Sequence, residues 1–240
     1  GDSAGAVTLE SVILARVARL APGARRFLEI VAVAGRPIRF AVVKQAADPN
    51  PRENVVEILR SGHLIRTRDM DAKEEVEAYH DRIREAVVAS LSAEDAKSHH
   101  RRLAVALDAS GEADPEWLAL HWKEAGDLER AADYAIAAAA QAAEALAFDR
   151  AARLYSLGLE LSQPKQAEPE PRRRLQVNLG DALSNAGRGG EAAAVYLAAA
   201  EGAPTAEALE LQRRAADQLV RTGHIEEGLP LLRQVLEKVG

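Results

Sequence analysis

The sequence contains no cysteine, and aromatic residues make up only 4% of its 240 residues. The absence of cysteine excludes a disulfide scaffold, a thiol enzyme and a cysteine-ligated zinc site. Alanine, in contrast, accounts for 50 residues. Because alanine is the best helix former and adds little core volume, the composition favours many closely packed helices over an all-β fold.

Long apolar runs and an excess of basic residues are also lacking. No stretch of 18 apolar residues is free of charge, so we expect no membrane-spanning helix, no membrane partner and a cytoplasmic location. Residues 1–112 carry 17 basic and 17 acidic side chains, and residues 113–240 carry 14 and 20. Because neither part has the basic excess that a phosphate backbone attracts, nucleic acid is not an expected partner.

Sequence signatures of catalysis and metal binding are missing as well. The chain has no G-x-x-x-x-G-K-[S/T], no G-x-S-x-G and no H-E-x-x-H motif. His99 and His100 are adjacent, so on a helix they point about 100° apart and cannot chelate one metal ion. We therefore expect a chain without catalytic residues, and without a metal or cofactor of its own. Since it begins without methionine and ends directly after a helical pattern, we interpret it as a piece of a longer protein.

The first part of the chain combines helical and strand patterns. Four helices and then two short strands are expected over residues 9–20, 25–33, 40–47, 53–60, 63–68 and 75–79. An acidic turn joins the strands. Helical periodicity then returns, and Ser92 with Asp95 forms a capping-box-like start to a further helix. Helices, a hairpin and a helix are the order of a winged-helix domain, which we place at residues 8–112.

From Asp114 onward the pattern is entirely helical, and it repeats. When Gly187 is aligned with Gly223, small residues fall on small ones and bulky residues on bulky ones, except that Ala199 falls on Val235. This pattern resembles the tetratricopeptide repeat (TPR), in which small residues let antiparallel helices approach closely. The landmark positions are Gly180, Gly187, Ala192, Tyr196, Ala199, Pro204, Ala216, Gly223 and Gly228, and in an earlier copy Phe148, Ala151 and Tyr155. The alternative is a non-repeating helical bundle with alanine-rich seams.

Together these patterns predict a mainly α protein. Its winged-helix domain with a small β-hairpin would be followed by a TPR-like α-solenoid over residues 113–240. Pro230 lies inside the last helical pattern, where it predicts a kink or a late helix start near Gly228.

The most specific local motif is Tyr-His-Asp-Arg-Ile-Arg-Glu-Ala-Val, from Tyr79 to Val87. With segments 90–92 and 100–104 behind it, and segments 117–122, 125–127 and 147–152 further downstream, it resembles the winged-helix and repeat region of bacterial signal-transduction ATPases with numerous domains (STAND). These regulatory relatives of the AAA ATPases include LuxR-like and MalT-like regulators. The similarity is greatest to serine/threonine kinases that carry such an ATPase and helical repeats.

The resemblance implies a role for His80 and Asp81. They would correspond to a His-Asp pair whose histidine reaches the nucleotide phosphate in the resting, ADP-bound state. ATP or ADP would belong to the longer protein, because the phosphate-binding domain is absent here. The methionine that often precedes the pair is Tyr79 in this chain. The alternative is that His80 is a packed histidine and Asp81 only a helix N-cap.

Three functions follow as hypotheses. In the first, the winged helix regulates its own ATPase domain, and the repeats bind a protein or peptide in their groove. In the second, the chain is a fragment of a LuxR-like or MalT-like DNA-binding regulator, which the acidic hairpin turn disfavours. In the third, it is a scaffold that self-associates through a truncated last repeat, at Leu229, Leu232 and Leu236.

Overall fold

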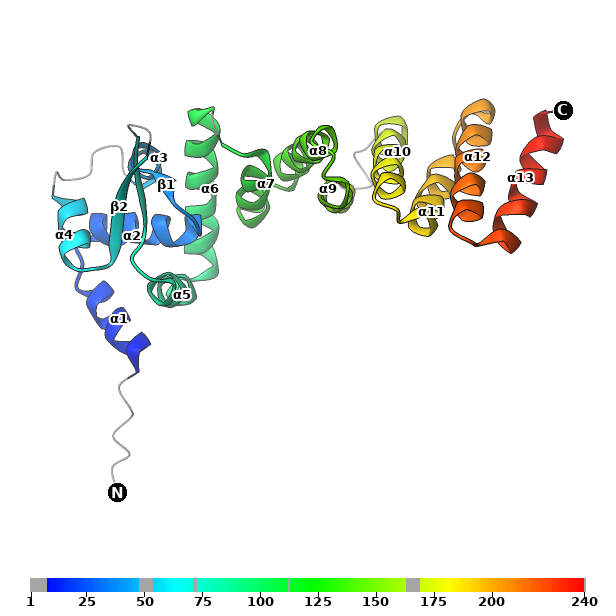
Figure 1. The fold of residues 1–240 in the computed structure, drawn as a ribbon. Helices are drawn as coiled ribbons and strands as arrows, with labels where there is room; N and C mark the ends of the chain where they lie inside the picture. Colours follow the sequence, from blue (N-terminus) through cyan, green and yellow to red (C-terminus); the bar gives the residue numbers. More distant parts are fainter. Residues whose placement is uncertain (1–7, 48–53, 71–72, 112, 163–168, 240) are drawn as a thin grey trace, which may run out of the picture. The chain divides into compact units, whose positions relative to one another are not determined.

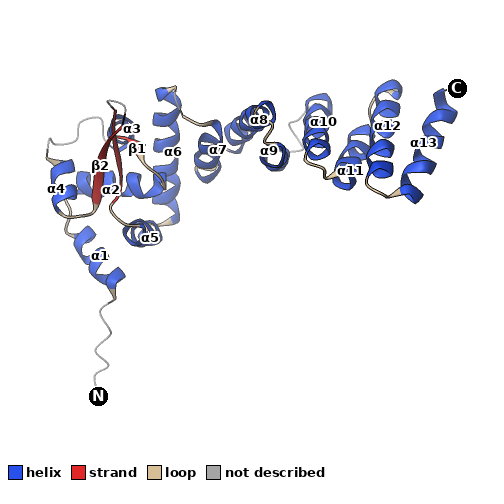
Figure 2. Ribbon diagram, in the orientation of Figure 1, coloured by secondary structure: helices blue, strands red, loops and turns tan. Residues whose placement is uncertain are grey.

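The computed structural model describes the chain except for residues 1–7, 48–53, 71–72, 112, 163–168 and 240 (Figure 1). Helices dominate the described residues, and the strands form one small sheet (Figure 2). The predicted mainly α fold with a small antiparallel sheet is therefore confirmed. Packing divides the chain into two compact units, residues 1–113 with 120–127 and residues 114–119 with 128–240. The assignment of residues 8–112 as a winged helix stays a prediction.

The N-terminal unit contains six helices among its described residues before residue 112. They are α1 (Leu9–Ala18), α2 (Pro22–Ala34), α3 (Phe40–Ala47), α4 (Val55–Ser61), α5 (Asp81–Ser90) and α6 (Ala93–Ser110). The hydroxyl of Thr8 caps α1 by accepting a hydrogen bond from the Ser11 amide at 3.1 Å. The helix α2 ends at Gly35, whose φ of 73° is readily adopted only by glycine. The predicted start of α4 at Glu53 and the middle of the acidic turn lie outside the described residues.

A three-stranded antiparallel sheet packs against these helices. The predicted hairpin is present as β2 (Ile65–Met70) and β3 (Lys73–Ala78), and a short strand β1 (Ile38–Arg39) pairs with the other edge of β3. Ile65 and Val76 are fully buried on the core side. The helix α2 supplies the apolar surface that this core needs, because a hairpin alone is only marginally stable.

The sheet's outer face is charged. Arg66 and Arg68 lie 2.8 and 3.0 Å from the same carboxylate oxygen of Glu77. The alternation of buried and charged side chains fixes the pairing register, since a one-residue slip would move every charge into the core.

Helices alone form the second unit in its described part. The helix α7 (Pro115–Glu124) contributes residues to both units. It is followed by α8 (Leu128–Glu144), α9 (Phe148–Leu161), α10 (Pro169–Asn185), α11 (Gly189–Ala200), α12 (Thr205–Arg221) and α13 (Ile225–Val239). From α8 on, each helix packs against the next along a row (Figure 1). Gly187 and Gly223, with φ of 77° and 87°, turn the chain between successive helices.

The predicted late start of the last helix is wrong. The helix α13 begins at Ile225 and contains Pro230. Packing explains its first turn: a Cβ on Gly228 would lie 2.7 Å from Cγ2 of Val220, so α13 lies almost in backbone contact with α12 there. This contact holds the turn helical although Pro230 cannot donate a backbone hydrogen bond.

Small residues set the spacing of the helices inside one repeat. A Cβ on Gly180 would lie 2.5 Å from Cε1 of Tyr196, so the tyrosine ring of α11 lies directly on the backbone of α10. The ring cannot move aside freely, because its hydroxyl donates a hydrogen bond to Asp181 at 2.6 Å. Gly180 and Tyr196 are therefore complementary in shape.

We predict that Gly180→Ala lowers the free energy of unfolding of the repeats by about 1–3 kcal/mol, because it overpacks this contact. Gly190→Ala is the matched control. Gly190 is also helical, and its nearest neighbour, Cε1 of His224, would be 3.6 Å from the new Cβ. Its effect should stay within about 0.5 kcal/mol. Urea unfolding followed by circular dichroism measures both, and equal effects would contradict the packing account.

Candidate functional site

The structure places His80 and Asp81 at the start of α5. His80 is the N-cap residue, with φ −143° and ψ 150°, and its side chain makes no capping hydrogen bond. Asp81 is the first helical residue, with a side chain 90% exposed and 3.7 Å from Nε of Arg84. The expectation that Asp81 is the N-cap is wrong, because the chain enters the helix one residue earlier. The alternative of a packed His80 is also wrong, since His80 is exposed.

The ring of Tyr79, just before this pair, contacts two histidine rings. The His80 ring meets the Tyr79 ring edge-on, with centroids 4.9 Å apart, and the His63 ring does the same at 5.3 Å. His63 has a positive φ of 52°, which is uncommon for a residue with a side chain. Sequence patterns assigned His63 to a strand and so did not reveal this contact. The result is an accessible histidine beside the first turn of a ten-residue helix, where backbone N–H groups favour an anion.

The second candidate region is a groove on the repeats, which we call the α8–α10 groove. It has a volume of about 320 Å³. Its apolar lining comes from Ile136 of α8, Leu159 of α9 and Leu175 of α10. Arg174 and Asn178, both exposed on α10, stand at its edge. Apolar lining with a few hydrogen-bond donors suits a peptide segment that inserts an apolar side chain.

A larger groove of about 600 Å³ lies between α9 and α11. Leu179 and Leu183 of α10 line it together with Leu157 and Val195. At one end Arg188 forms a two-pronged ion pair with Glu191, at 2.8 and 2.7 Å. Arg188 and Glu191 are therefore paired with each other, whereas no ion pair joins Arg174 of the α8–α10 groove within the described part of the chain.

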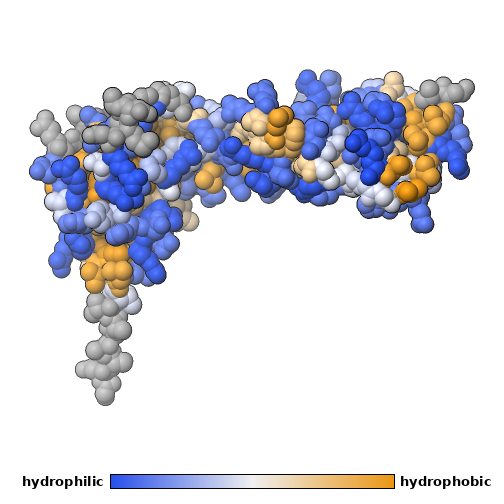
Figure 3. Space-filling view, viewed as in Figure 1, coloured by the Kyte–Doolittle hydropathy of each residue, from blue (hydrophilic) through white to orange (hydrophobic). Residues whose placement is uncertain are grey.

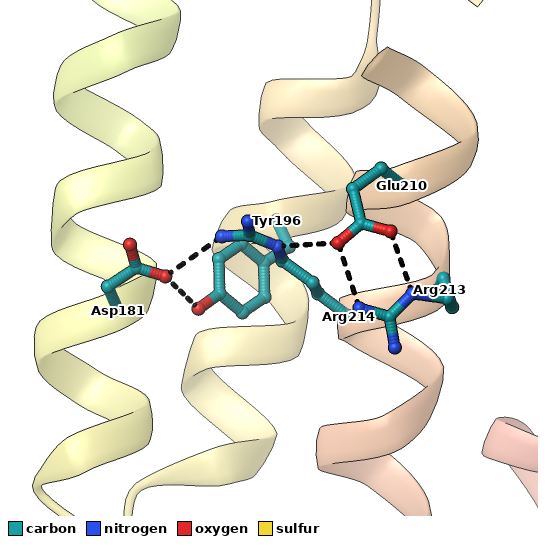
Figure 4. Close-up of polar contacts among 5 residues, drawn as sticks. All are labelled: Asp181, Tyr196, Glu210, Arg213 and Arg214. Atoms are coloured by element: carbon teal, nitrogen blue, oxygen red, sulfur yellow. Dashed lines mark hydrogen bonds and ion pairs between the residues drawn. The ribbon is translucent and has the colours of Figure 1, made fainter. Parts of the chain in front are cut away.

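A polar network connects three consecutive helices of the repeats (Figure 4). Asp181 on α10 accepts hydrogen bonds from the Tyr196 hydroxyl of α11 at 2.6 Å and from Arg214 of α12 at 3.3 Å. Glu210 then accepts bonds from Arg213 and Arg214, at 2.7 to 3.0 Å. Burial above all, and then the bond to Asp181, raise the pKa of Tyr196, so the hydroxyl remains a donor. The network thus links one repeat to the next.

The other repeat landmarks lie in buried contacts between helices or at the start of a helix. The small residues are buried between helices: Ala151, Ala192, Ala199, Ala216 and Gly228. Tyr155 is buried, and Phe148 is half-buried at the start of α9. Pro204 is the N-cap residue of α12, so it opens the next repeat.

Exposed apolar side chains gather on α13 (Figure 3). Leu229 is 48% exposed and Leu236 is 63% exposed, whereas Leu232 is half-buried. The apolar face that the self-association hypothesis needs is therefore present at two of its three residues.

No cluster of three histidine, aspartate or glutamate side chains among the described residues could hold a metal ion. No helix described in the structure is long and apolar enough to cross a bilayer.

The sequence matches no protein-family model and no curated protein. Among solved structures it resembles the crystal structure of a STAND protein with a tetratricopeptide repeat sensor from Pyrococcus horikoshii, with a TM-score of 0.57 and 15% sequence identity. The superposition covers 97% of this chain and 34% of that chain.

This likeness concerns the fold, and it fits the predicted TPR-like α-solenoid. The chain spans about a third of the length of that protein.

The ion pairs of Glu210 predict a pH dependence. The bonds from Arg213 above all, and then from Arg214, lower the pKa of Glu210 to about 2, from an ordinary value of 4.5. A lowered carboxylate pKa stabilises the fold above pH 4.5, and this contribution is lost as the pH falls towards 2. We expect Glu210→Gln to remove that contribution, at most about 1 kcal/mol because the pairs are exposed to solvent. Melting temperatures between pH 6 and 2.5 measure it; a variant that follows the parent chain at every pH would contradict it.

Proposed function

We propose that the chain is a non-catalytic regulatory and protein-interaction part of a larger signalling ATPase of the STAND class. The observation that carries the proposal is the α8–α10 groove on a TPR-like solenoid, whose apolar lining and polar edge suit a peptide. A neighbour of the same fold is described as a STAND protein with a TPR sensor. Binding in the groove would change the population of resting and active states of the ATPase.

The N-terminal unit would be the part that regulates the ATPase. Its helices, followed by a β-hairpin and then α5, support the assignment of a winged helix. His80 is exposed beside the N-terminus of α5, where it can donate to a phosphate oxygen. The nucleotide, ATP or ADP, would be bound by the ATPase domain of the longer protein. The similarity of residues 79–87 and of the downstream segments to kinase–ATPase fusions supports a serine/threonine kinase as its output.

The groove assignment predicts the effect of a single substitution. Peptides selected on the chain from a displayed random library should bind Asn178→Arg at least about tenfold more weakly, because the longer side chain fills the groove edge. Asn185→Arg is the matched control, since Asn185 is exposed on the same helix and does not line the groove. Calorimetric titration with synthetic copies of the peptides measures both. If no peptide is enriched, or if the two variants bind alike, the groove is not the binding site.

The role of His80 predicts a change in nucleotide release. In the longer protein that carries the ATPase domain, His80→Ala should speed the release of a fluorescent ADP analogue, because the phosphate loses a donor. His63→Ala is the control, since His63 contacts the same Tyr79 ring but does not cap α5. Stopped-flow fluorescence gives both rates. Equal release from His80→Ala and the parent would reject phosphate sensing.

A further inference from the structure

Two histidines join α6 to α7 inside the N-terminal unit. Nδ1 of His100 lies 2.8 Å from Nδ1 of His121, and the ring centroids are 5.0 Å apart. His121 is completely buried and His100 is half-buried. Because the two Nδ1 atoms face each other, one must donate and the other accept, so at least one ring is neutral while the bond exists. The bond therefore depends directly on protonation.

Charged groups from several elements surround the pair. His99 of α6 and Glu124 of α7 act on His100, and Arg36, between α2 and β1, acts on His121. His99 is itself held by Glu29 of α2 at 2.9 Å. A second link to α6 is the 3.7 Å contact between Arg101 and Asp127, just after α7.

These surroundings favour the neutral rings. Burial above all, and then the nearby His100 and Arg36, lower the pKa of His121 to about 3. Burial also lowers the pKa of His100, an effect that Glu124 opposes and His99 reinforces. The carboxylate of Glu29 is bound to His99, and Glu124 is the carboxylate that opposes the lowering of the His100 pKa.

The histidine pair lies where α7 packs against the N-terminal unit, so its protonation would affect that packing. Residues 114–119, in the first half of α7, pack with the repeats, and residues 120–127 pack with the N-terminal unit. The helix α7 is thus the segment through which the chain passes from one unit to the other. We propose that the His100–His121 pair is an acid-sensitive latch: protonation of both rings breaks their hydrogen bond, sets two positive charges against each other and releases the second half of α7 from α6.

The direction of the pH effect follows from linkage. A released, solvated histidine titrates near pH 6.5, whereas the latched rings resist protonation. The latched state is therefore favoured fully above pH 6.5, and this advantage is lost as the pH falls from 6.5 towards 3. The equilibrium constant for release rises by up to about tenfold per pH unit for each ring that gains a proton on release. A regulatory signal that acidifies the surroundings would therefore release the second half of α7 from α6.

The chain contains its own reporter of this change. Its two tryptophans, Trp117 and Trp122, both lie on α7, and Trp122 is only 1% exposed. With Trp117→Phe as the background, Trp122 alone gives the fluorescence. We expect its emission maximum to shift to the red and its quenching by acrylamide to rise between pH 7.5 and 3.5, while the helical circular dichroism stays constant.

Variants of single histidines test the assignment. His100→Asn keeps a hydrogen-bonding side chain that does not titrate, so it should weaken the pH response of Trp122 and leave only the part that His121 contributes. His63→Asn replaces an exposed histidine of the same unit and should leave the response unchanged. An unchanged Trp122 signal down to pH 3.5, an equal response in His100→Asn, or a simultaneous loss of helical signal would each overturn the latch.

Titration of the histidine ring signals in the unmodified chain by nuclear magnetic resonance covers the case in which His100→Asn does not fold. The latch requires two rings to protonate together with the Trp122 shift. If every ring titrates near pH 6.5 and Trp122 does not move, the latch is absent.

Discussion

The close approach of helix backbones is the constraint on which the repeat unit depends. Residues without bulk lie where helices meet: Ala135, Ala139 and Ala151 are completely buried, and Gly180 supports the ring of Tyr196. Each small side chain contributes little apolar area by itself, so the stability of this unit comes from many such contacts between successive helices. Because small side chains fill most contacts between these helices, few aromatic residues are required. They are needed only where two helices leave a gap.

The core of the N-terminal unit is built from larger side chains. Its core uses bulky and β-branched side chains, such as Phe27, Ile30 and Val76, because a sheet must be covered by a broad apolar surface. Arg66 and Arg68 lie on the opposite face, where both pair with the carboxylate of Glu77. This arrangement keeps α5 and its exposed N-terminus at the end of β3, where His80 remains accessible.

Polar contacts fix how the helices of the repeats align, which the apolar contacts alone would leave undetermined. The alanine seams would tolerate sliding of one helix along another, since alanine surfaces are alike. The chain of bonds from Tyr196 through Asp181 and Arg214 to Glu210 fixes α10, α11 and α12 in one register (Figure 4). A partner bound in the α8–α10 groove would therefore meet a preformed surface, which lowers the ordering cost of binding.

Local patterns determined most of the secondary structure. Residues 40–47 were predicted as a helix with the bounds that the structure has, because periodicity, caps and turns act over one or two turns of chain. The two-residue strand β1 has no period to detect, and it exists only because β3 offers it an edge. Likewise, Asp181 meets Arg214 and His100 meets His121 across 33 and 21 residues. Such contacts depend on how helices pack, so tertiary structure alone decided the groove, the polar network and the histidine pair. The TPR landmarks and the His80 motif, in contrast, could be read from the sequence because they are local patterns.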